Sequence, residues 1–130
     1  MESQSLDFKQ TPDRSHRKQF LKDLAESVVC FANSEGGVLV VGVADRAETR
    51  NGALVGVDLV HWPLQDLVSA IHQRTSPSIT VRTAVIPFEG KTFYALGVLP
   101  GSDVFGTTEG VYKIRLHNRC VPLVGQELRG

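Results

Sequence analysis

The fold is decided by residues 31–43, which read Phe31-Ala32-Asn33-Ser34-Glu35-Gly36-Gly37-Val38-Leu39-Val40-Val41-Gly42-Val43. Two adjacent glycines supply the backbone freedom that a sharp turn after a helix needs, and Asn33 can hydrogen-bond backbone groups in that turn. The β-branched run that follows is apolar at nearly every position, which is typical of a strand buried on both faces. We therefore expect a helix end, a tight turn and a central strand over Val38–Val43.

The residues before this stretch predict a short strand and a long helix. Leu6–Lys9 alternates apolar and charged side chains, which is a strand pattern. Asp13 or Ser15 can cap the helix that follows. Apolar residues then recur at spacings of three and four up to a helix end near Asn33, namely Phe20, Leu21, Leu24, Val28 and Ala32.

The residues after it predict one more helix and several strands. Asp45–Gly52 reads as a polar loop, and Leu54–Val57 as a strand that returns beside the central one in a hairpin with a wide turn. Pro63 suits the first turn of a second helix, which ends before Pro77. Further strands are expected at Ile79–Ile86, Lys91–Leu99 and Val111–Leu116, with a turn at Glu89-Gly90 and a mobile glycine-containing loop over Pro100–Gly110.

Taken together, the elements predict an α/β fold. Their order is roughly β-α-β-β-α-β-β-β, which favours a mixed β-sheet with two main helices packed against it. A chain of 130 residues fits a single domain, residues 1–130. Such a domain can also be the N-terminal module of a longer protein.

Composition excludes several classes of protein. Lys and Arg total 14 and so do Asp and Glu, so the formal net charge is zero and any nucleic-acid-binding face must come from local clustering. No apolar run reaches membrane-spanning length and the first residues carry an acid, so we expect a cytoplasmic protein. Cys30 and Cys120 lie in apolar surroundings without metal-ligand spacing, which favours buried free thiols. The sequence has no P-loop and no nucleophile elbow.

Two groups of basic residues are candidates for binding an anion. Arg14, His16, Arg17, Lys18 and Lys22 surround the start of the first helix, where the helix dipole disfavours cations and an anionic ligand would relieve the conflict. The second group alternates along the last strand, so that its four side chains would form a stripe on one face: Lys113, Arg115, His117 and Arg119. Such a stripe can follow a phosphate backbone. The alternative is an ordinary solvated strand face.

Trp62 is a candidate for stacking on a base if it is exposed. It can equally pack as a hydrophobic staple at the start of the second helix. The sequence leaves both interpretations open.

Several separated motifs resemble the AlbA_2 domain of the Schlafen family. Glu2 with Leu6-Asp7-Phe8-Lys9 is similar to the opening of that domain, and residues 31–45 are similar to its central signature. Gly52, Gly56-Val57, Tyr112-Lys113-Ile114-Arg115 and Val121-Pro122 match its later strands. Two departures are Asp7, where the family has Glu, and Leu116-His117-Asn118, where it has Gly-Ser.

The resemblance implies binding of RNA or DNA, with a homodimer possible. The resemblance and the two basic groups together give the residues expected to bind nucleic acid: Lys9, Arg14, Arg17, Lys18, Lys113, Arg115 and Arg119. A second interpretation is a metal-dependent endoribonuclease, in which Glu2, Asp7 and Asp45 hold Mg²⁺ or Mn²⁺ and are the catalytic residues. Alternatively, Glu2 is only a terminal residue, Asp7 pairs with a surface lysine, and Asp45 is a turn residue. A third interpretation is a structural or oligomerisation module without a ligand.

Overall fold

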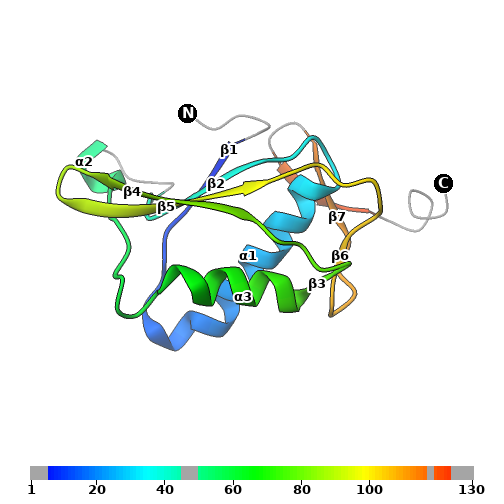
Figure 1. Cartoon of the computed structure of the whole chain (residues 1–130), viewed down its shortest axis with the longest axis horizontal. Coiled ribbons are helices and arrows are strands. Elements are labelled where there is room, and N and C mark those ends of the chain that lie inside the picture. Colours follow the sequence, from blue (N-terminus) through cyan, green and yellow to red (C-terminus); the bar gives the residue numbers. More distant parts are fainter. Residues whose placement is uncertain (1–5, 45–49, 117–118, 124–130) are drawn as a thin grey trace.

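The computed structural model describes residues 6–44, 50–116 and 119–123 (Figure 1). Its elements are β1 (Leu6–Lys9), η1 (Arg14–His16), α1 (Arg17–Ala32), β2 (Gly37–Val41), α2 (Arg50–Ala53), α3 (Leu64–Arg74), β3 (Thr75–Ser76), β4 (Arg82–Phe88), β5 (Lys91–Val98), β6 (Gly106–Thr107), β7 (Lys113–Leu116) and β8 (Arg119–Pro122). The predicted α/β class with two main helices is confirmed. Within the described residues, no helix is long and apolar enough to cross a membrane.

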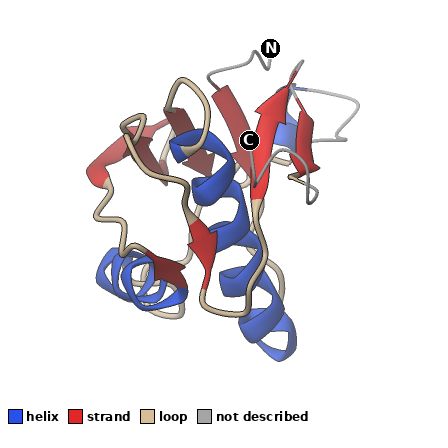
Figure 2. Cartoon of the chain, turned by 90° about the vertical axis from the view of Figure 1, so that its right-hand side faces the viewer, coloured by secondary structure: helices blue, strands red, loops and turns tan. Residues whose placement is uncertain are grey.

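The main sheet has four strands in the order β1-β2-β5-β4. β1 runs parallel to β2, whereas β5 is antiparallel to both β2 and β4, so the predicted mixed sheet is confirmed. Two small ribbons, β3-β6 and β7-β8, lie apart from this sheet (Figure 2). Because β1 pairs with β2, the opening segment of the chain lies directly beside the strand that follows the double glycine.

The core lies between one face of the sheet and the helices α1 and α3, which are below the sheet in Figure 1. Leu39 and Val41 of β2 and Leu96 of β5 are fully buried there, against Leu24 of α1 and Leu67 of α3. Burying an aliphatic side chain of this size contributes about 1.5–3 kcal/mol. The periodic apolar face predicted for each helix therefore forms the centre of the core.

The prediction that the central strand is buried on both faces is wrong. Leu39 and Val41 point to the helices, but the alternate residue Val38 is 37% exposed on the other face. Both helices cover the same face of the sheet (Figure 1), so the apolar residues on the opposite face are less covered. A continuous apolar run in the sequence therefore does not tell whether helices cover one face of the sheet or both.

The hairpin predicted after the central strand is also wrong. Between these segments the structure has one isolated bridge, from Val43 to Leu54, and no strand at 54–57. Part of the predicted loop at 45–52 forms the short helix α2, and residues 45–49 lie outside the described residues. The next predicted strand starts later than expected, because Ile79 and Val81 are buried in the core before β4 begins.

The turn between α1 and β2 forms as expected. Gly36 has φ +77°, and its backbone N–H donates to the carbonyl oxygen of Phe31 at 2.8 Å. A Cβ atom on Gly36 would lie 2.5 Å from the carbonyl oxygen of Val98. Glycine is thus required here both for the left-handed backbone and for the close approach of β5.

The segment 100–110, predicted as a mobile loop, is tied to the domain. β6 within it pairs with β3, and the N–H of Gly101 donates to the carbonyl oxygen of Ala32 at 2.9 Å. The final predicted strand is shorter than expected, and a second strand, β8, turns back along it.

The prediction of two buried free thiols is wrong. Cys30 of α1 is buried, but Cys120 of β8 is exposed, and the two form a disulfide with Cα atoms 5.9 Å apart. They are separated by 90 residues, so their spacing in the sequence gave no sign of the pairing. The disulfide fastens the β7-β8 ribbon to α1.

Candidate nucleic-acid interface

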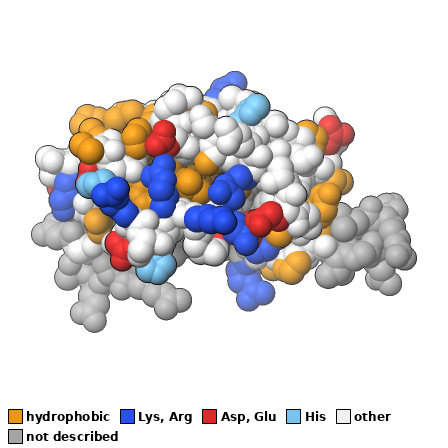
Figure 3. Space-filling view, turned by 90° about the horizontal axis from the view of Figure 1, so that it is seen from below, with side chains coloured by type: hydrophobic (Ala, Val, Ile, Leu, Met, Phe, Trp, Pro, Cys, Tyr) orange, Lys and Arg blue, Asp and Glu red, His pale blue; other side chains and the backbone are white. Residues whose placement is uncertain are grey.

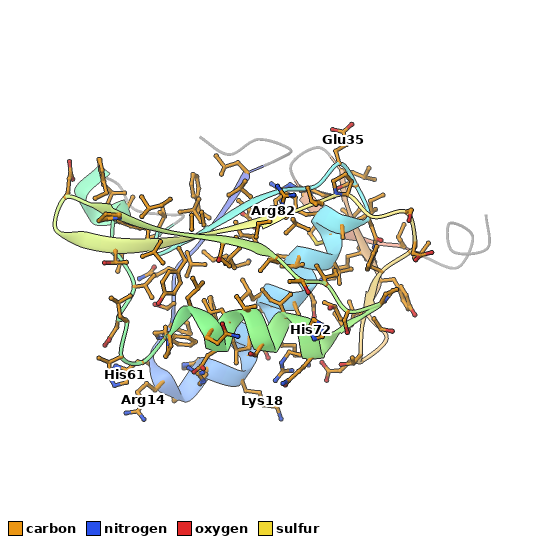
Figure 4. The ribbon with its side chains drawn as sticks, viewed as in Figure 1. Arg14, Lys18, Glu35, His61, His72 and Arg82 are labelled. Carbon is orange, nitrogen blue, oxygen red and sulfur yellow. A yellow bond between two sulfur atoms is a disulfide. The ribbon has the colours of Figure 1, made fainter. Side chains whose placement is uncertain are left out.

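Cations gather along one side of α1, some of them fully exposed and others half-buried. Lys18 and Lys22 are one helical turn apart and therefore share a face, and Arg14 lies four residues earlier in η1. Arg74, at the end of α3, lines a small surface pocket together with Lys22. Figure 3 shows Lys and Arg side chains gathered on this underside, and Figure 4 shows Arg14 and Lys18 pointing away from the sheet. We call Arg14, Lys18, Lys22 and Arg74 the basic row.

The basic row is only weakly neutralised by neighbouring acids. Lys22 Nζ is 3.5 Å from a carboxylate oxygen of Glu109, and the two side chains are 37% and 53% exposed. Such surface pairs contribute little and exchange readily with solvent ions. A phosphate group could replace this carboxylate at small cost.

Arg17, another predicted binding residue, is held in place by its neighbours. Its Nη1 donates to the carbonyl oxygen of His61 at 2.9 Å, and its Nη2 donates to Asp66 at 3.0 Å. The guanidinium carbon also lies 4.9 Å from the centre of the Trp62 ring, a cation–π contact. Arg17 therefore links the start of α1 to the start of α3.

Trp62 is a core residue and not an exposed stacking platform. Its side chain is buried, and its ring meets Phe20 edge-on with 5.1 Å between ring centres. Tyr94 donates its hydroxyl proton to the carbonyl oxygen of Trp62 at 2.6 Å, and burial raises the pKa of this hydroxyl. Trp62 therefore packs into the core just before α3 begins, against the side of α1.

An open cavity of about 610 Å³ lies at one end of the basic row. It is lined by Arg14, Ser15, Arg17, Val60, His61, Pro63 and Asp66. Beside it, His61 Nδ1 lies 2.6 Å from Asp58, and this hydrogen bond, with one from the N–H of Val60, lowers the pKa of Asp58. The acids around the cavity limit its positive charge, so the cavity alone makes a weak anion site.

Two members of the second predicted basic group, Lys113 and Arg115, are held against the rest of the domain. The guanidinium of Arg115 is buried, donates to the carbonyl oxygen of Leu6 at 3.1 Å and lies 4.8 Å from the centre of the Phe31 ring. Lys113 Nζ donates to Glu26 of α1 at 2.8 Å. Both cations bind the β7-β8 ribbon to the rest of the domain.

The prediction that the four basic residues of this group share one strand face is wrong. The chain reverses between β7 and β8, and Arg119 pairs with Leu116, whose side chain is on the face opposite to that of Arg115. Arg119 is exposed. His117 lies outside the described residues.

Only one of the three predicted metal-binding carboxylates can be placed. Asp7 is opposite Leu39 in the β1-β2 pairing, accepts a hydrogen bond from the N–H of Phe8 at 2.9 Å, and lies 3.9 Å from Nζ of Lys9. Its side chain is 18% exposed, and that of Lys9 is 22% exposed. Glu2 and Asp45 lie outside the described residues, and the described ones contain no cluster of three metal-ligating side chains.

Asn33 has a structural role that its sequence position did not reveal. Its amide nitrogen donates to the carbonyl oxygens of Phe105 and Lys113, each at 2.8 Å, and its amide oxygen accepts from the N–H of Phe105 at 2.7 Å. The expected hydrogen bonds within the turn are thus replaced by bonds to two distant segments. A polar residue at the end of an apolar helix face was the available signal.

Nothing in the sequence marks Arg74 as part of the basic row. It belongs to α3, and it joins the basic row because α3 packs beside α1. Neighbouring cations on two different helices leave no spacing signal in the sequence.

The chain belongs to the Schlafen AlbA_2 family, whose model matches residues 2–124. The DIP2311 protein from Corynebacterium diphtheriae has a similar structure, with 23% identity, a TM-score of 0.72 and 92% of this chain covered. This chain spans only 22% of that one. The N-terminal domain of a Nitrosomonas europaea protein, related by name to the ATP-dependent DNA helicase RecG, has 24% identity and a TM-score of 0.61, with 95% of this chain and 80% of that one covered. The search of curated proteins found no match.

Proposed function

We propose that this domain binds nucleic acid by contacting the phosphate backbone with the basic row. The observation that carries the proposal is the grouping of cations from η1, α1 and α3 on one face, where Arg14 and Lys18 are exposed and Lys22 and Arg74 are half-buried. Membership of the AlbA_2 family and the similarity to a domain of a protein named after a DNA helicase support it. RNA and DNA both present a phosphate backbone that lysine and arginine side chains can contact.

The size of the basic row predicts moderate, salt-sensitive affinity. Neutralising four phosphates of a duplex gives a slope of about −3.6 in a plot of log K against log salt concentration, or about a hundredfold loss of affinity between 50 and 200 mM salt. A formal net charge of zero means that the chain as a whole adds no net attraction for phosphates to this effect. Binding should therefore be local to the underside.

The test is a titration of labelled RNA and DNA, single- and double-stranded, by fluorescence anisotropy at several salt concentrations. The double variant Lys18→Gln/Lys22→Gln should lower the affinity and reduce the slope by about 1.8. Arg82→Gln removes a single charge from an exposed residue that lies away from the underside (Figure 4), so it is the control for position and should leave the salt slope unchanged. Equal losses in both variants, or binding indifferent to salt, would contradict the proposal.

We also propose a test of the metal-dependent endoribonuclease interpretation, which rests on Asp7 in β1 beside β2. Asp7→Asn should abolish RNA cleavage in the presence of Mn²⁺ while leaving the salt slope of binding unchanged. If the wild-type chain shows no Mn²⁺-dependent cleavage, this interpretation fails and the binding proposal stands. Lys9, Arg119 and a cytoplasmic location remain predictions of the sequence.

A further inference from the structure

One edge of the main sheet is an exposed strand with an apolar character. All seven residues of β4 are exposed, and its large apolar side chains Val85, Ile86 and Phe88 are 54%, 40% and 44% exposed. β5 covers one side of β4, and the order of strands places β4 at the end of the sheet (Figure 1). An exposed edge of this length is able to pair with another strand.

The position of Pro87 determines which backbone groups of β4 face outward. Proline has no N–H, so within an antiparallel pair it occupies a position that does not donate to the neighbouring strand. The turn supports this assignment: Glu89 and Gly90 both have positive φ, as in a two-residue hairpin turn whose flanking residues Phe88 and Lys91 form a hydrogen-bonded pair. By alternation, the outward groups are those of Thr83, Val85 and Pro87.

These outward groups complement a second copy of the same strand. When two β4 strands pair antiparallel with Ala84 on the two-fold axis, Thr83 of one copy is opposite Val85 of the other, and each N–H meets a carbonyl oxygen. The charged Arg82 is then opposite Ile86, so like charges do not meet. With Val85 on the axis instead, the carbonyl of Thr83 would face Pro87, which has no N–H to donate.

We propose that β4 is a self-association edge, through which two copies of the domain form one continuous eight-stranded sheet. We assign a second copy of the domain to this edge, because the outward N–H and carbonyl groups of β4 pair with those of another β4 in a register that avoids Pro87. The contact area of one strand pair is below that of standard stable interfaces, so the dimer should depend on protein concentration.

If the domain binds nucleic acid as proposed above, pairing of the two β4 edges also affects that binding. The two-fold axis of an antiparallel strand pair is perpendicular to the sheet, so the helices of both copies lie on the same side. Both basic rows would then face one nucleic acid, and two linked sites raise the overall affinity through effective concentration.

The register is tested by engineered cysteines oxidised with copper phenanthroline in the absence of nucleic acid. In the proposed dimer, the Cα atoms of the two Ala84 residues are about 4.5 Å apart, within the range that a disulfide spans. The two Ile86 residues are displaced by four positions, or about 14 Å. Ala84→Cys should therefore give a cross-linked dimer, and the matched Ile86→Cys variant should not.

A second measurement follows association without cross-linking, by light scattering after gel filtration over a range of concentrations. Val85→Pro removes an outward N–H without touching the pairing to β5, so it should lower dimerisation at least tenfold, whereas Val85→Thr should not. Equal cross-linking at positions 84 and 86, or a wild-type chain that stays monomeric at millimolar concentration, would overturn the proposal. Lys18→Gln/Lys22→Gln should dimerise normally, which separates failure of the edge from failure of nucleic-acid binding.

Discussion

The cations of the basic row and those of β7 differ in their exposure to solvent and in how closely they are paired with other groups. In the basic row, Lys18 and Lys22 extend from a helix surface, and Lys22 has a weak partner in Glu109 at 3.5 Å. In β7, Arg115 is buried over Phe31, and Lys113 is 2.8 Å from Glu26, whose side chain is 18% exposed. The first region is open to a ligand, whereas the second holds a ribbon to a helix.

The contrast shows that alternation along a strand identifies a shared face but not whether that face meets solvent. The alternating side chains of Lys113 and Arg115 do share a face, and α1 covers it. The predictions below therefore separate the two regions by stability, from the largest expected effect to the smallest.

The largest effect should come from releasing the β7-β8 ribbon. In oxidised protein, Cys120→Ser should reduce the free energy of unfolding by about 4 kcal/mol, because the disulfide closes a loop of about 90 residues. Urea unfolding followed by circular dichroism measures the change. Wild-type protein in excess reductant should match the variant, and a wild type that is insensitive to reductant would contradict the assignment.

The next effect should come from the amide that joins the two distant segments to the end of α1. Asn33→Ala removes three hydrogen bonds and leaves the backbone groups of Phe105 and Lys113 without that partner, so we expect a loss of about 3 kcal/mol. Urea unfolding again provides the measurement. Asn33→Asp keeps the acceptor for the N–H of Phe105 but places oxygens against two carbonyls, so it should not restore stability.

Arg115→Met should lower the stability by about 2 kcal/mol. Methionine retains much of the apolar stem over Phe31 but loses the charged hydrogen bond to Leu6. Thermal and urea unfolding report this loss. The salt slope of nucleic-acid binding should stay at the wild-type value, and a slope reduced by about 1 would instead place Arg115 in contact with phosphate.

The smallest effect compares two lysines that each pair with a glutamate. Lys113→Met should cost about 1 kcal/mol because its partner Glu26 is mostly shielded from solvent, whereas Lys22→Met should change the stability by less than about 0.5 kcal/mol. Parallel urea titrations measure both. Equal losses of unfolding free energy in the two variants would contradict the proposed difference between the two ion pairs.

The main elements of the fold could be predicted from local patterns. Leu6–Lys9, the helix ending near Asn33, the glycine turn and the hairpin through Glu89-Gly90 all follow from periodicity and turn chemistry, and all are present. Asp13 accepts from the N–H of Ser15 and so caps η1, whereas α1, the helix that Asp13 or Ser15 was expected to cap, begins after His16 without a side-chain cap.

The remainder depends on contacts between distant residues. Cys30 meets Cys120, Arg74 lies beside Lys22, and Asn33 reaches Phe105, and none of these pairs has a characteristic spacing in the chain. The α2 helix and the reversal into β8 were missed because weak propensities are decided by tertiary packing. The cations at the start of α1 were found because they are consecutive in sequence.

The bond between Cys30 and Cys120 gives the domain a dependence on its chemical surroundings. Disulfides persist in oxidising compartments and are reduced where glutathione and thioredoxin are active. In such a reducing cell, the ribbon would keep the amide contacts of Asn33 and the pairing of Lys113 with Glu26 but lose its covalent link. The domain would then resist proteases better in an oxidising compartment, where the disulfide is intact, than in a reducing one.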